Sequence, residues 1–598
     1  MTRPLHTVAL VKQVPRAEEL VLGEDGRLAR TGVELELNPY CRRAVAKAVQ
    51  LARDSGGTCT VVTLGPPAAE DCLREAIACG AGRGVLVTDP AFAGSDTLAT
   101  ARALAAALRR LGPVDLVLCG RNSVDAETAQ TPAQVAELLG LPMAAGVRRL
   151  AVEDGRVRAR CEHEDGCVEL ELPLPVLISC AERLITPAKA RPDARAAVPA
   201  EQIVRVGAAA LGPGPWGQDG SRTVVGRTRA MAGTRMRLRF PGDLGTQVER
   251  AVATLTELGA FDRAAGTSAP PVPDRVAGLT GTGAVAVLAE PGRHRHTRAM
   301  LGAAARIAAV TRRPVTALAT GALSPAIAGS WGADTVVAVN GSTVEEDVAA
   351  SLATWCAEHR PWALLAPSTM WGREVAARTA ARLGLGLAGD AVDVEAGPDG
   401  DLVCWKPAFS GSMLAAVTCS PPTRVVTLRG GALPLPPPRV AVAAQGPHLP
   451  VPPGSRVRVV ARERDDDIDV LAVASAVVGV GAGVPPGDYP LLAPLLEVLG
   501  ADLAATRKVT DRGWLPRARQ VGVTGRSVAP RLYVAIGTSG KFNHLCGTRG
   551  AGFVLGVNTD PAAPLFGAAD VGIVGDWREV VPLLITALTP STVPEPIR

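Results

Sequence analysis

The sequence contains few aromatic residues and no dense basic segment. Aromatic side chains make up 3% of the 598 residues, and the formal net charge is only +5. Nucleic-acid-binding proteins typically combine a clustered basic surface with aromatic side chains that stack on bases. Both absences argue against nucleic acid as a partner.

The sequence also lacks an apolar stretch of the length that a membrane helix needs. The longest apolar run, residues 470–484, is rich in alanine and glycine. It is shorter than the ~18 to 20 residues that span a bilayer. Near the amino terminus, residues 8–11 are apolar but Lys12 follows at once, so we find no secretory hydrophobic segment. We therefore expect a cytoplasmic protein without direct membrane insertion.

Cysteine pairs at metal-binding or redox spacing are absent as well. The 12 cysteines are dispersed, without a Cys-x-x-Cys pair or a cysteine and histidine cluster. Dispersed cysteines of this kind are typical of buried thiols in a reducing compartment. We expect no metal site.

What the sequence does contain is a repeated alternation of strands and helices. Residues 6–225 alternate apolar strands with alanine-rich amphipathic helices, and a second alternation begins near residue 284. This pattern predicts parallel sheets covered by helices on both faces. We predict an α/β fold with two related parallel-sheet domains and a Rossmann-like domain at the carboxyl end.

Two proline-rich stretches suggest where these domains are joined. Prolines cluster at 270–273 and again at 434–453, which suits exposed and semi-rigid connections. We predict five parts: a first α/β domain at 1–226, a connecting segment at 227–282, a second α/β domain at 283–432, a linker at 433–454 and a cofactor-binding domain at 455–598.

Residues 520–544 are the most informative segment for function. Two glycine turns, 522–525 and 537–540, flank the apolar run 532–536, which is typical of a buried strand. Ligands of open α/β sheets lie beyond the carboxyl ends of parallel strands, where loops leave backbone amides free. The segment therefore predicts a cofactor-binding edge. Short polar groups are available there from Thr524, Thr538, Ser539, Asn543 and His544.

An ordered set of motifs resembles the electron-transfer flavoproteins, with a beta-subunit-like half fused in front of an alpha-subunit-like half. The beta-like motifs are VKQVP at 11–15, LNPY at 37–40, GSDTLATA at 94–101 and the segment 120–132. The alpha-like motifs are PSTMWGR at 367–373, ARLGLGLAGD at 381–390, KPAFSG at 406–411, TR at 506–507, GW at 513–514, QVGVTGRSVAP at 520–530, NH at 543–544, NTDP at 558–561 and ADVGIVGD at 569–576.

The resemblance implies an FAD in the last domain that accepts electrons from flavin-containing dehydrogenases of the acyl-CoA dehydrogenase type and passes them to a quinone reductase. It implies that Arg507 lies against the flavin ring, where its fixed charge favours negative charge on that ring. It also implies that His544 faces a pyrimidine oxygen of the flavin. The implied FAD-binding residues are Thr506, Arg507, Gln520, Val521, Gly522, Thr524, Gly525, Thr538, Ser539, Gly540, Asn543, His544, Asn558 and Asp576.

In the beta-like half the resemblance implies a second nucleotide, either AMP or a second FAD. A second FAD belongs to the electron-bifurcating branch of the family, whose members oxidise NADH. The implied residues for either ligand are Asn38, Asp125, Thr128, Gln130 and Thr131, with Asp96, Thr97 and Thr100 added for a flavin.

Several alternatives remain open at this point. Asp125 and Asp576 are also common turn and helix-cap residues. A protein that binds adenine nucleotides without redox chemistry, for regulation or as a scaffold, would share much of the pattern. An NAD-linked oxidoreductase is disfavoured, because no Gly-x-Gly-x-x-Gly stands at a strand-to-helix turn with an acidic residue about 20 positions on. The segment 182–191 matches the family's dehydrogenase-docking loop poorly.

Overall fold

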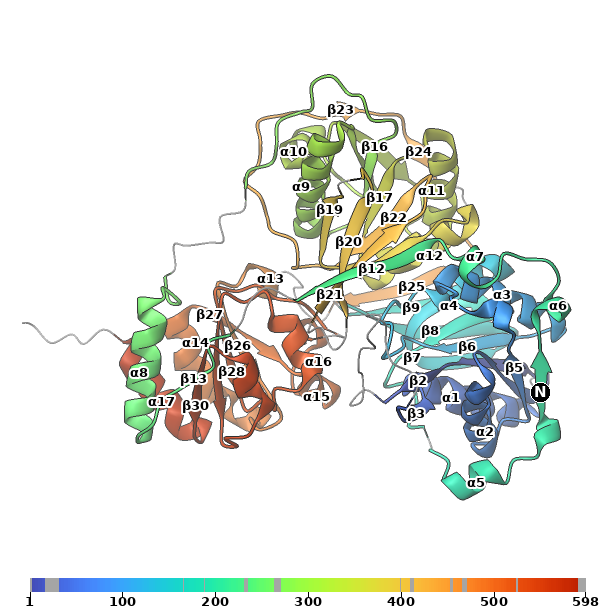
Figure 1. Ribbon diagram of the computed structural model, residues 1–598, viewed down its shortest axis with the longest axis horizontal. Helices are drawn as coiled ribbons and strands as arrows, with labels where there is room; N and C mark the ends of the chain where they lie inside the picture. The colour runs from blue at the N-terminus through green and yellow to red at the C-terminus, as the bar shows by residue number, and fades with distance from the viewer. Residues whose placement is uncertain are drawn as a thin grey trace, which may run out of the picture.

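The computed structural model confirms the predicted α/β class and shows three sheet-centred parts (Figure 1). Among the described residues, no helix is both long and apolar enough to cross a membrane. The described residues are 3–16, 32–164, 166–187, 189–230, 235–262, 270–397, 399–408, 413–451, 455–464, 470–522 and 525–589.

The first sheet is centred on β1 (His6–Val11), which pairs in parallel with a strand on each side. Its last five residues are buried, as expected for a parallel strand covered by helices on both faces. Helix α1 (Cys41–Ser55) is closed by Gly56, whose left-handed conformation is typical of a helix end. In spatial order the strands are β11 (Ile203–Val206), β5 (Arg83–Val87), β4 (Thr58–Leu64), β1, β6 (Leu116–Gly120), β10 (Val176–Cys180), β7 (Met143–Glu153), β8 (Arg156–His163), β9 (Gly166–Pro173) and β25 (Arg458–Arg464). The main helices are α1 (Cys41–Ser55), α2 (Glu70–Ala78), α3 (Thr97–Arg110) and α4 (Thr131–Leu139).

The second sheet repeats the strand order of the first. Strand β14 (Val285–Ala289) takes the central place, β15 and β16 extend the sheet on one side, and β17, β22 and β18 extend it on the other. The two halves therefore share their sheet topology as well as the alternation of strands and helices in their sequences. The remaining strands are β15 (Val315–Ala319), β16 (Thr335–Asn340), β17 (Ala363–Pro367), β18 (Leu387–Ala391), β22 (Arg424–Leu428), β23 (Ala444–Gln445) and β24 (Leu449–Pro450). The helices are α9 (His294–Thr311), α10 (Pro325–Trp331), α11 (Glu345–His359) and α12 (Met370–Leu383).

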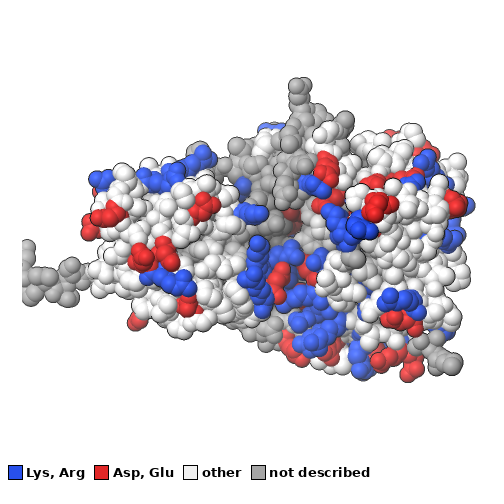
Figure 2. All heavy atoms as spheres, turned by 90° about the horizontal axis from the view of Figure 1, so that it is seen from below, with Lys and Arg blue, Asp and Glu red and all other residues white. Residues whose placement is uncertain are grey.

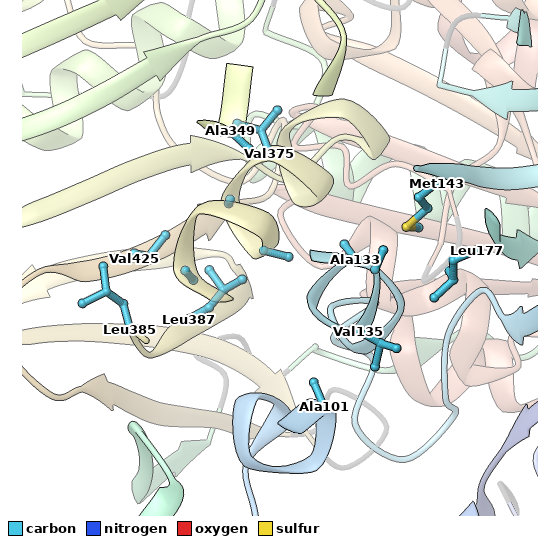
Figure 3. Close-up of a cluster of buried hydrophobic side chains, with 14 of the residues drawn as sticks. Ala101, Ala133, Val135, Met143, Leu177, Ala349, Val375, Leu385, Leu387 and Val425 are labelled. Atoms are coloured by element: carbon cyan, nitrogen blue, oxygen red, sulfur yellow. The ribbon is translucent and has the colours of Figure 1, made fainter. Parts of the chain in front are cut away.

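The two halves share one apolar core. Side chains of α3, α4, β7 and β10 in the first domain form a continuous buried cluster with side chains of α11, α12, β18 and β22 in the second. Figure 3 shows both sets, with Ala133 and Val135 of α4 on one side and Val375 of α12 on the other. A smaller antiparallel sheet also joins the halves, because its edge strand β12 comes from the first. Its strands are β12 (Thr223–Ala230), β21 (Met413–Cys419), β20 (Leu402–Ala408) and β19 (Asp393–Ala396).

The third sheet is parallel throughout the described residues. Strand β28 (Leu532–Ile536) lies near its centre and is fully buried, as the sequence predicts. Around it, in spatial order, are β13 (Leu238–Arg239), β30 (Val571–Val574), β29 (Phe553–Asn558), β28, β26 (Ala476–Val480) and β27 (Ala501–Ala505). The helices are α8 (Leu244–Glu257), α13 (Val470–Val473), α14 (Ala493–Leu499), α15 (Arg507–Asp511), α16 (Phe542–Leu545) and α17 (Trp577–Leu588).

Two segments lie in a different part of the fold from the one that the sequence predicts. The connecting segment 227–282 contributes β13 and α8 to the third domain, where α8 packs against α17 (Figure 1). Conversely, β25, which was expected in the third domain, pairs antiparallel with β9 of the first. Both segments pair with strands far away in sequence, so local pattern gives no sign of their partners.

In its described part the proline-rich stretch 433–454 packs against the second domain at several points, while residues such as Val440 and Val442 stay exposed. Strands β23 and β24 pair with β16 along the edge of the second sheet. Leu433, Ala443 and Val451 are buried. Val272, from the other proline-rich stretch, is buried as well and donates its N–H to the Pro437 carbonyl over 3.1 Å. Proline-rich chain can therefore pack here through the apolar residues between its prolines.

Candidate functional site

The carboxyl edge of the third sheet brings together most of the residues predicted to hold FAD. Strands β26 to β30 run in parallel, so the segments that follow them emerge at one edge. Thr506 and Arg507 follow β27, Thr538, Ser539 and Gly540 follow β28, Asn558 ends β29 and Asp576 follows β30.

Glycine is required where the loops of this edge approach each other. A Cβ atom on Gly481 would lie 2.0 Å from the carbonyl oxygen of Gly537. One on Gly540, which has a left-handed φ of 70°, would lie 2.0 Å from the amide nitrogen of Leu565. No side chain fits at such distances, so the backbones meet directly. Glycine-rich turns of this kind at the carboxyl edge of a parallel sheet are typical of sites for an anionic group such as a diphosphate.

Within the part of the chain that the structure describes, the buried hydroxyl of Thr538 has no hydrogen-bond partner. The residue is 1% exposed, and its carbonyl accepts from the Asn558 amide nitrogen Nδ2 over 2.8 Å. Buried hydroxyls in folded proteins are nearly always bonded, and an unbonded one points to a missing ligand or water. The residues present therefore fit a polar cofactor at this turn.

The loop from Gln520 to Gly525 is held from several sides. Val521 N–H donates to Ala505 O over 2.9 Å, and Arg526 N–H donates to Gln520 O over 2.8 Å. The Gln520 side-chain oxygen accepts from the Thr510 hydroxyl over 2.7 Å, so Gln520 is a buried loop anchor. Gly522 lies in the same turn. Thr524 and the side chain of Asn543 lie outside the described residues.

Arg507 lies at the start of α15, between the third domain and the first. Its Nε donates to Asp511 Oδ2 over 3.1 Å, and its Nη2 lies 3.7 Å from Glu182 Oε1 of the first domain. Glu182 is buried and also lies 3.5 Å from Arg121. Burial alone would raise its pKa, but the guanidinium groups of Arg121, Arg517 and Arg507 lower the pKa of Glu182 to about 2. The positive charge of Arg507 is thus partly balanced by an ionised carboxylate.

His544 lies on α16, close behind the turn that follows β28. Its Nδ1 lies 3.0 Å from Val521 O and its Nε2 lies 2.8 Å from the Tyr533 hydroxyl. Burial lowers the pKa of His544 to about 4, so the ring is neutral near pH 7. Both ring nitrogens lie within hydrogen-bond distance of protein atoms at the edge where FAD is expected.

Asp576 is a helix cap, which was one of its two interpretations from sequence. Its Oδ1 accepts from the Arg578 N–H over 2.9 Å at the start of α17. Asp576 follows β30 and therefore lies at the same sheet edge as Asn558.

The predicted second-nucleotide residues of the first domain gather where the order of its strands reverses, between β1 and β6. This is the position at which open α/β sheets bind ligands. Asn38 is buried and donates from Nδ2 to Asn122 O over 2.8 Å. Asp125 forms an ion pair with Lys12 over 2.8 Å. Thr128 lies in the same loop, and Thr131 begins α4, whose amino end has no side-chain cap.

Two of the residues expected for a second flavin, Asp96 and Thr97, make hydrogen bonds within the protein. Asp96 caps α3 through Ala99 N–H at 2.9 Å, and its Oδ2 accepts from the N–H groups of Arg222 and Thr223. The Thr97 hydroxyl donates to Gln130 Oε1 over 2.7 Å. Gln130 in turn donates to Leu387 O of the second domain over 3.2 Å. Thr100 is half-buried one turn along α3.

A cavity of about 340 Å³ lies where the three domains meet. On the face seen in Figure 2, Lys and Arg side chains gather around the hollow between the left and right parts of the molecule. Among the described residues predicted to hold FAD, Gly525 alone lines the cavity. Glu164 lines it as well and accepts the Met370 N–H of α12 over 2.8 Å. The basic side chains in its wall are Arg121, Arg293, Arg295, Arg373, Arg517 and Arg526, and the acidic ones are Glu127, Glu164 and Asp390.

Comparison with known proteins gives the family. The model of the electron transfer flavoprotein domain matches residues 25–204 and 284–452. The model of the electron transfer flavoprotein FAD-binding domain matches residues 470–549. The chain therefore belongs to the electron transfer flavoprotein family, and its third domain is of the FAD-binding kind.

Individual relatives match the two halves separately. The electron transfer flavoprotein subunit alpha of Thermoanaerobacterium thermosaccharolyticum is 32% identical over 268 residues, which is 43% of this chain and 81% of that protein. Subunit beta from the same organism is 38% identical over 184 residues, covering 31% and 70%. Subunit CarD of the caffeyl-CoA reductase-Etf complex of Acetobacterium woodii is 37% identical over 185 residues, covering 31% and 71%. One chain thus combines a beta-like and an alpha-like half.

Sequence reasoning missed three residues that shape the site. Tyr533 was treated only as part of a buried strand, although a tyrosine inside an apolar run signals a hydroxyl that needs a partner. Glu182 approaches Arg507 from the first domain, and Arg121 lies beside Glu182. Nothing in their local sequence indicates that distant partner.

Proposed function

We propose that the chain transfers electrons from flavin-containing dehydrogenases of the acyl-CoA dehydrogenase type to a quinone reductase, through one FAD in the third domain. The family supports electron transfer, and the partners are those that family resemblance suggests. The observation that carries the proposal is the unbonded hydroxyl of Thr538 among glycine turns, at the edge where parallel sheets bind nucleotides.

Each group at this edge has a distinct role in the proposal. FAD, when bound, supplies uptake of an electron pair and release of single electrons. The Thr538 hydroxyl and the amides of residues 538–540 bind its diphosphate, while Asn558 and Asp576 bind the ribose and adenine end. Ser539 belongs to the same turn and provides one of these amides. Arg507 provides a cation near the ring, with its charge moderated by Glu182 at 3.7 Å.

For the second nucleotide of the first domain we propose AMP. The uncapped amino end of α4 suits a single phosphate, and Asn38, Asp125 and Thr128 surround that end of the sheet. A second FAD would need Asp96, Thr97 and Thr100, of which Asp96 and Thr97 already have protein partners. Electron bifurcation with NADH would require that second flavin, so it is the less supported alternative.

A two-step electron-transfer assay tests the proposal. The purified protein is mixed under anaerobic conditions with an acyl-CoA dehydrogenase and its acyl-CoA substrate, and flavin absorbance is followed. We expect loss of the oxidised flavin spectrum, and its return when a quinone reductase and a quinone are added. Reduction by NADH but not by the dehydrogenase would overturn the donor assignment and favour bifurcation. A colourless protein would favour the non-redox alternative.

A further inference from the structure

The two halves carry helices at equivalent positions of their sheets. In the first sheet the strand order reverses between β1 and β6, and α4 follows β6. In the second sheet the order reverses between β14 and β17, and α12 follows β17. Open α/β sheets bind ligands at this reversal, and the amino end of a helix there suits a phosphate. The second half therefore contains a counterpart of the position proposed above for AMP.

The amino end of α12 is occupied by a carboxylate from the other half of the chain. The N–H of Met370, the first residue of the helix, donates to Glu164 Oε1 over 2.8 Å. Glu164 lies in the turn between β8 and β9 of the first domain. The hydroxyl oxygen of Thr369 accepts the Gly372 N–H over 3.0 Å. Two N–H groups of the first turn are thus bonded to side-chain oxygens, one of them across the boundary between the halves.

The surroundings of Glu164 suit a negative charge. Arg293 and Arg373 of the second domain line the same cavity as Glu164. Burial alone would raise the pKa of Glu164, but the charges of Arg293, His163 and Arg373 lower this pKa below its usual value. The partial positive charge of a helix amino end also favours an anion. The place therefore has the chemistry of a phosphate site, and Glu164 supplies the negative charge.

The equivalent end of α4 is built differently. Within the described residues, Gln130 at the N-cap position of α4 forms no side-chain cap. Its amide bonds elsewhere, because Oε1 accepts from the Thr97 hydroxyl and Nε2 donates to Leu387 O. The two helices thus differ at the end where a phosphate would bind. Side chains of the protein cap α12, whereas the N-cap side chain of α4 is turned to other partners.

We propose that Glu164 takes the place of a nucleotide phosphate in the second domain. Its carboxylate fills the anion position at the amino end of α12, so the alpha-like half binds no nucleotide where the beta-like half binds one. The same contact ties a hairpin of the first domain to a helix of the second. The proposal rests on the proposed function only in taking the amino end of α4 as the phosphate site of the first domain.

The test observes the Met370 amide in the full chain with its bound nucleotides. The sequence contains 7 methionines, so labelling with nitrogen-15 methionine gives few amide signals, and Met370→Leu assigns the one of interest. Inorganic phosphate is titrated at constant ionic strength into the native protein and into Glu164→Ala. Glu153→Ala is the matched control, because Glu153 is an exposed glutamate at the end of β7 in the same domain.

In Glu164→Ala we expect the Met370 signal to move on mutation and then to titrate with phosphate to saturation, because the vacated helix end accepts a free anion. The native signal should stay unchanged at roughly ten times the phosphate concentration that half-saturates Glu164→Ala, because a tethered carboxylate outcompetes a free anion. Phosphate should also recover most of the loss in thermal midpoint of Glu164→Ala, compared with chloride at equal ionic strength. Glu153→Ala should behave as the native protein does.

A native Met370 signal that titrates with phosphate would overturn the proposal, and this measurement needs no variant to fold. A Glu164→Ala protein whose Met370 signal is unmoved by the mutation or indifferent to phosphate would overturn it too. Equal phosphate responses of Glu153→Ala and Glu164→Ala would place the effect elsewhere and count equally against it. These signals do not depend on a flavin, so failure to find FAD would count against the proposed function alone.

Discussion

Arg517 of the third domain donates from Nη1 to Glu162 Oε2 of the first domain over 2.9 Å. Glu162 is 2% exposed and accepts a second guanidinium, that of Arg183, over 2.9 Å. Nearby, Arg526 Nη2 donates to Glu164 O over 3.2 Å. The FAD-binding domain is therefore joined to the beta-like half by directional contacts of charged side chains. Because the two halves are fused, both sides of this interface belong to one chain.

Replacing Arg517 with methionine should loosen this contact. Hydrogen bonds to charged groups contribute about 1.5 to 3 kcal/mol, so local opening should become roughly tenfold or more frequent. Hydrogen exchange of the β8 and β9 amides should quicken accordingly. The matched control is Arg512→Met, because Arg512 stacks on Trp514 within its own domain. Unchanged exchange in Arg517→Met would contradict the importance of this ion pair.

Replacing Arg507 with alanine should lower the reduction potential of the flavin. A cation near the ring favours added negative charge, and its loss makes reduction less favourable. Spectroelectrochemical titration measures the shift. Arg578→Ala is a suitable control, since Arg578 is also a surface arginine of this domain and pairs with Asp488. Equal potentials in Arg507→Ala and the native protein would exclude this role.

Replacing Thr538 with valine should weaken FAD binding while preserving side-chain shape. Among the described residues the hydroxyl has no hydrogen-bond partner, so its removal should change the stability of the fold little. It should remove one charge-assisted hydrogen bond to the cofactor. We expect the FAD dissociation constant to rise roughly tenfold. Thr586→Val, on the exposed face of α17, serves as control. An unchanged constant would show that the hydroxyl does not face the cofactor.

The stability of the fold should depend on pH through Glu127. Burial raises the pKa of Glu127 to about 7, despite the opposing charge of Lys406. In the unfolded chain a glutamate side chain has a pKa of about 4.3. The folded state therefore binds this proton more tightly than the unfolded state does. The resulting contribution to the free energy of unfolding is fully present below about pH 4 and is lost as pH rises through about 7.

Glu127→Gln should flatten that dependence. Between pH 5 and 8, its denaturant midpoint should fall less than that of the native protein, because glutamine keeps the neutral state. Denaturation curves at the two pH values measure this. Parallel losses in both proteins would mean that Glu127 is ionised in the folded state throughout.

Much of the fold could be predicted because its strands are continuous apolar runs. The run at 532–536 and the glycine turns beside it fix a buried strand and a sheet edge from local chemistry alone. The order of motifs then gave the family, which the comparisons confirm. Fold class and the FAD-binding domain were therefore accessible from sequence.

Long-range partners were not accessible in the same way. Strand β25 and helix α8 carry no local mark of the sheets that they join, because their pairing depends on residues hundreds of positions away. The orientation of His544 depends on a tyrosine hydroxyl, and the environment of Arg507 depends on Glu182. Sequence could place these residues near the cofactor edge, but their hydrogen-bond partners come only from the folded chain.

The most direct test of the account is a count of bound nucleotides. The purified protein is denatured, and the released nucleotides are separated by chromatography and quantified per chain. The account predicts one FAD and one AMP. Two FAD would overturn the assignment of AMP to the first domain, and a protein that releases no flavin would contradict the central claim that the third domain holds FAD for electron transfer.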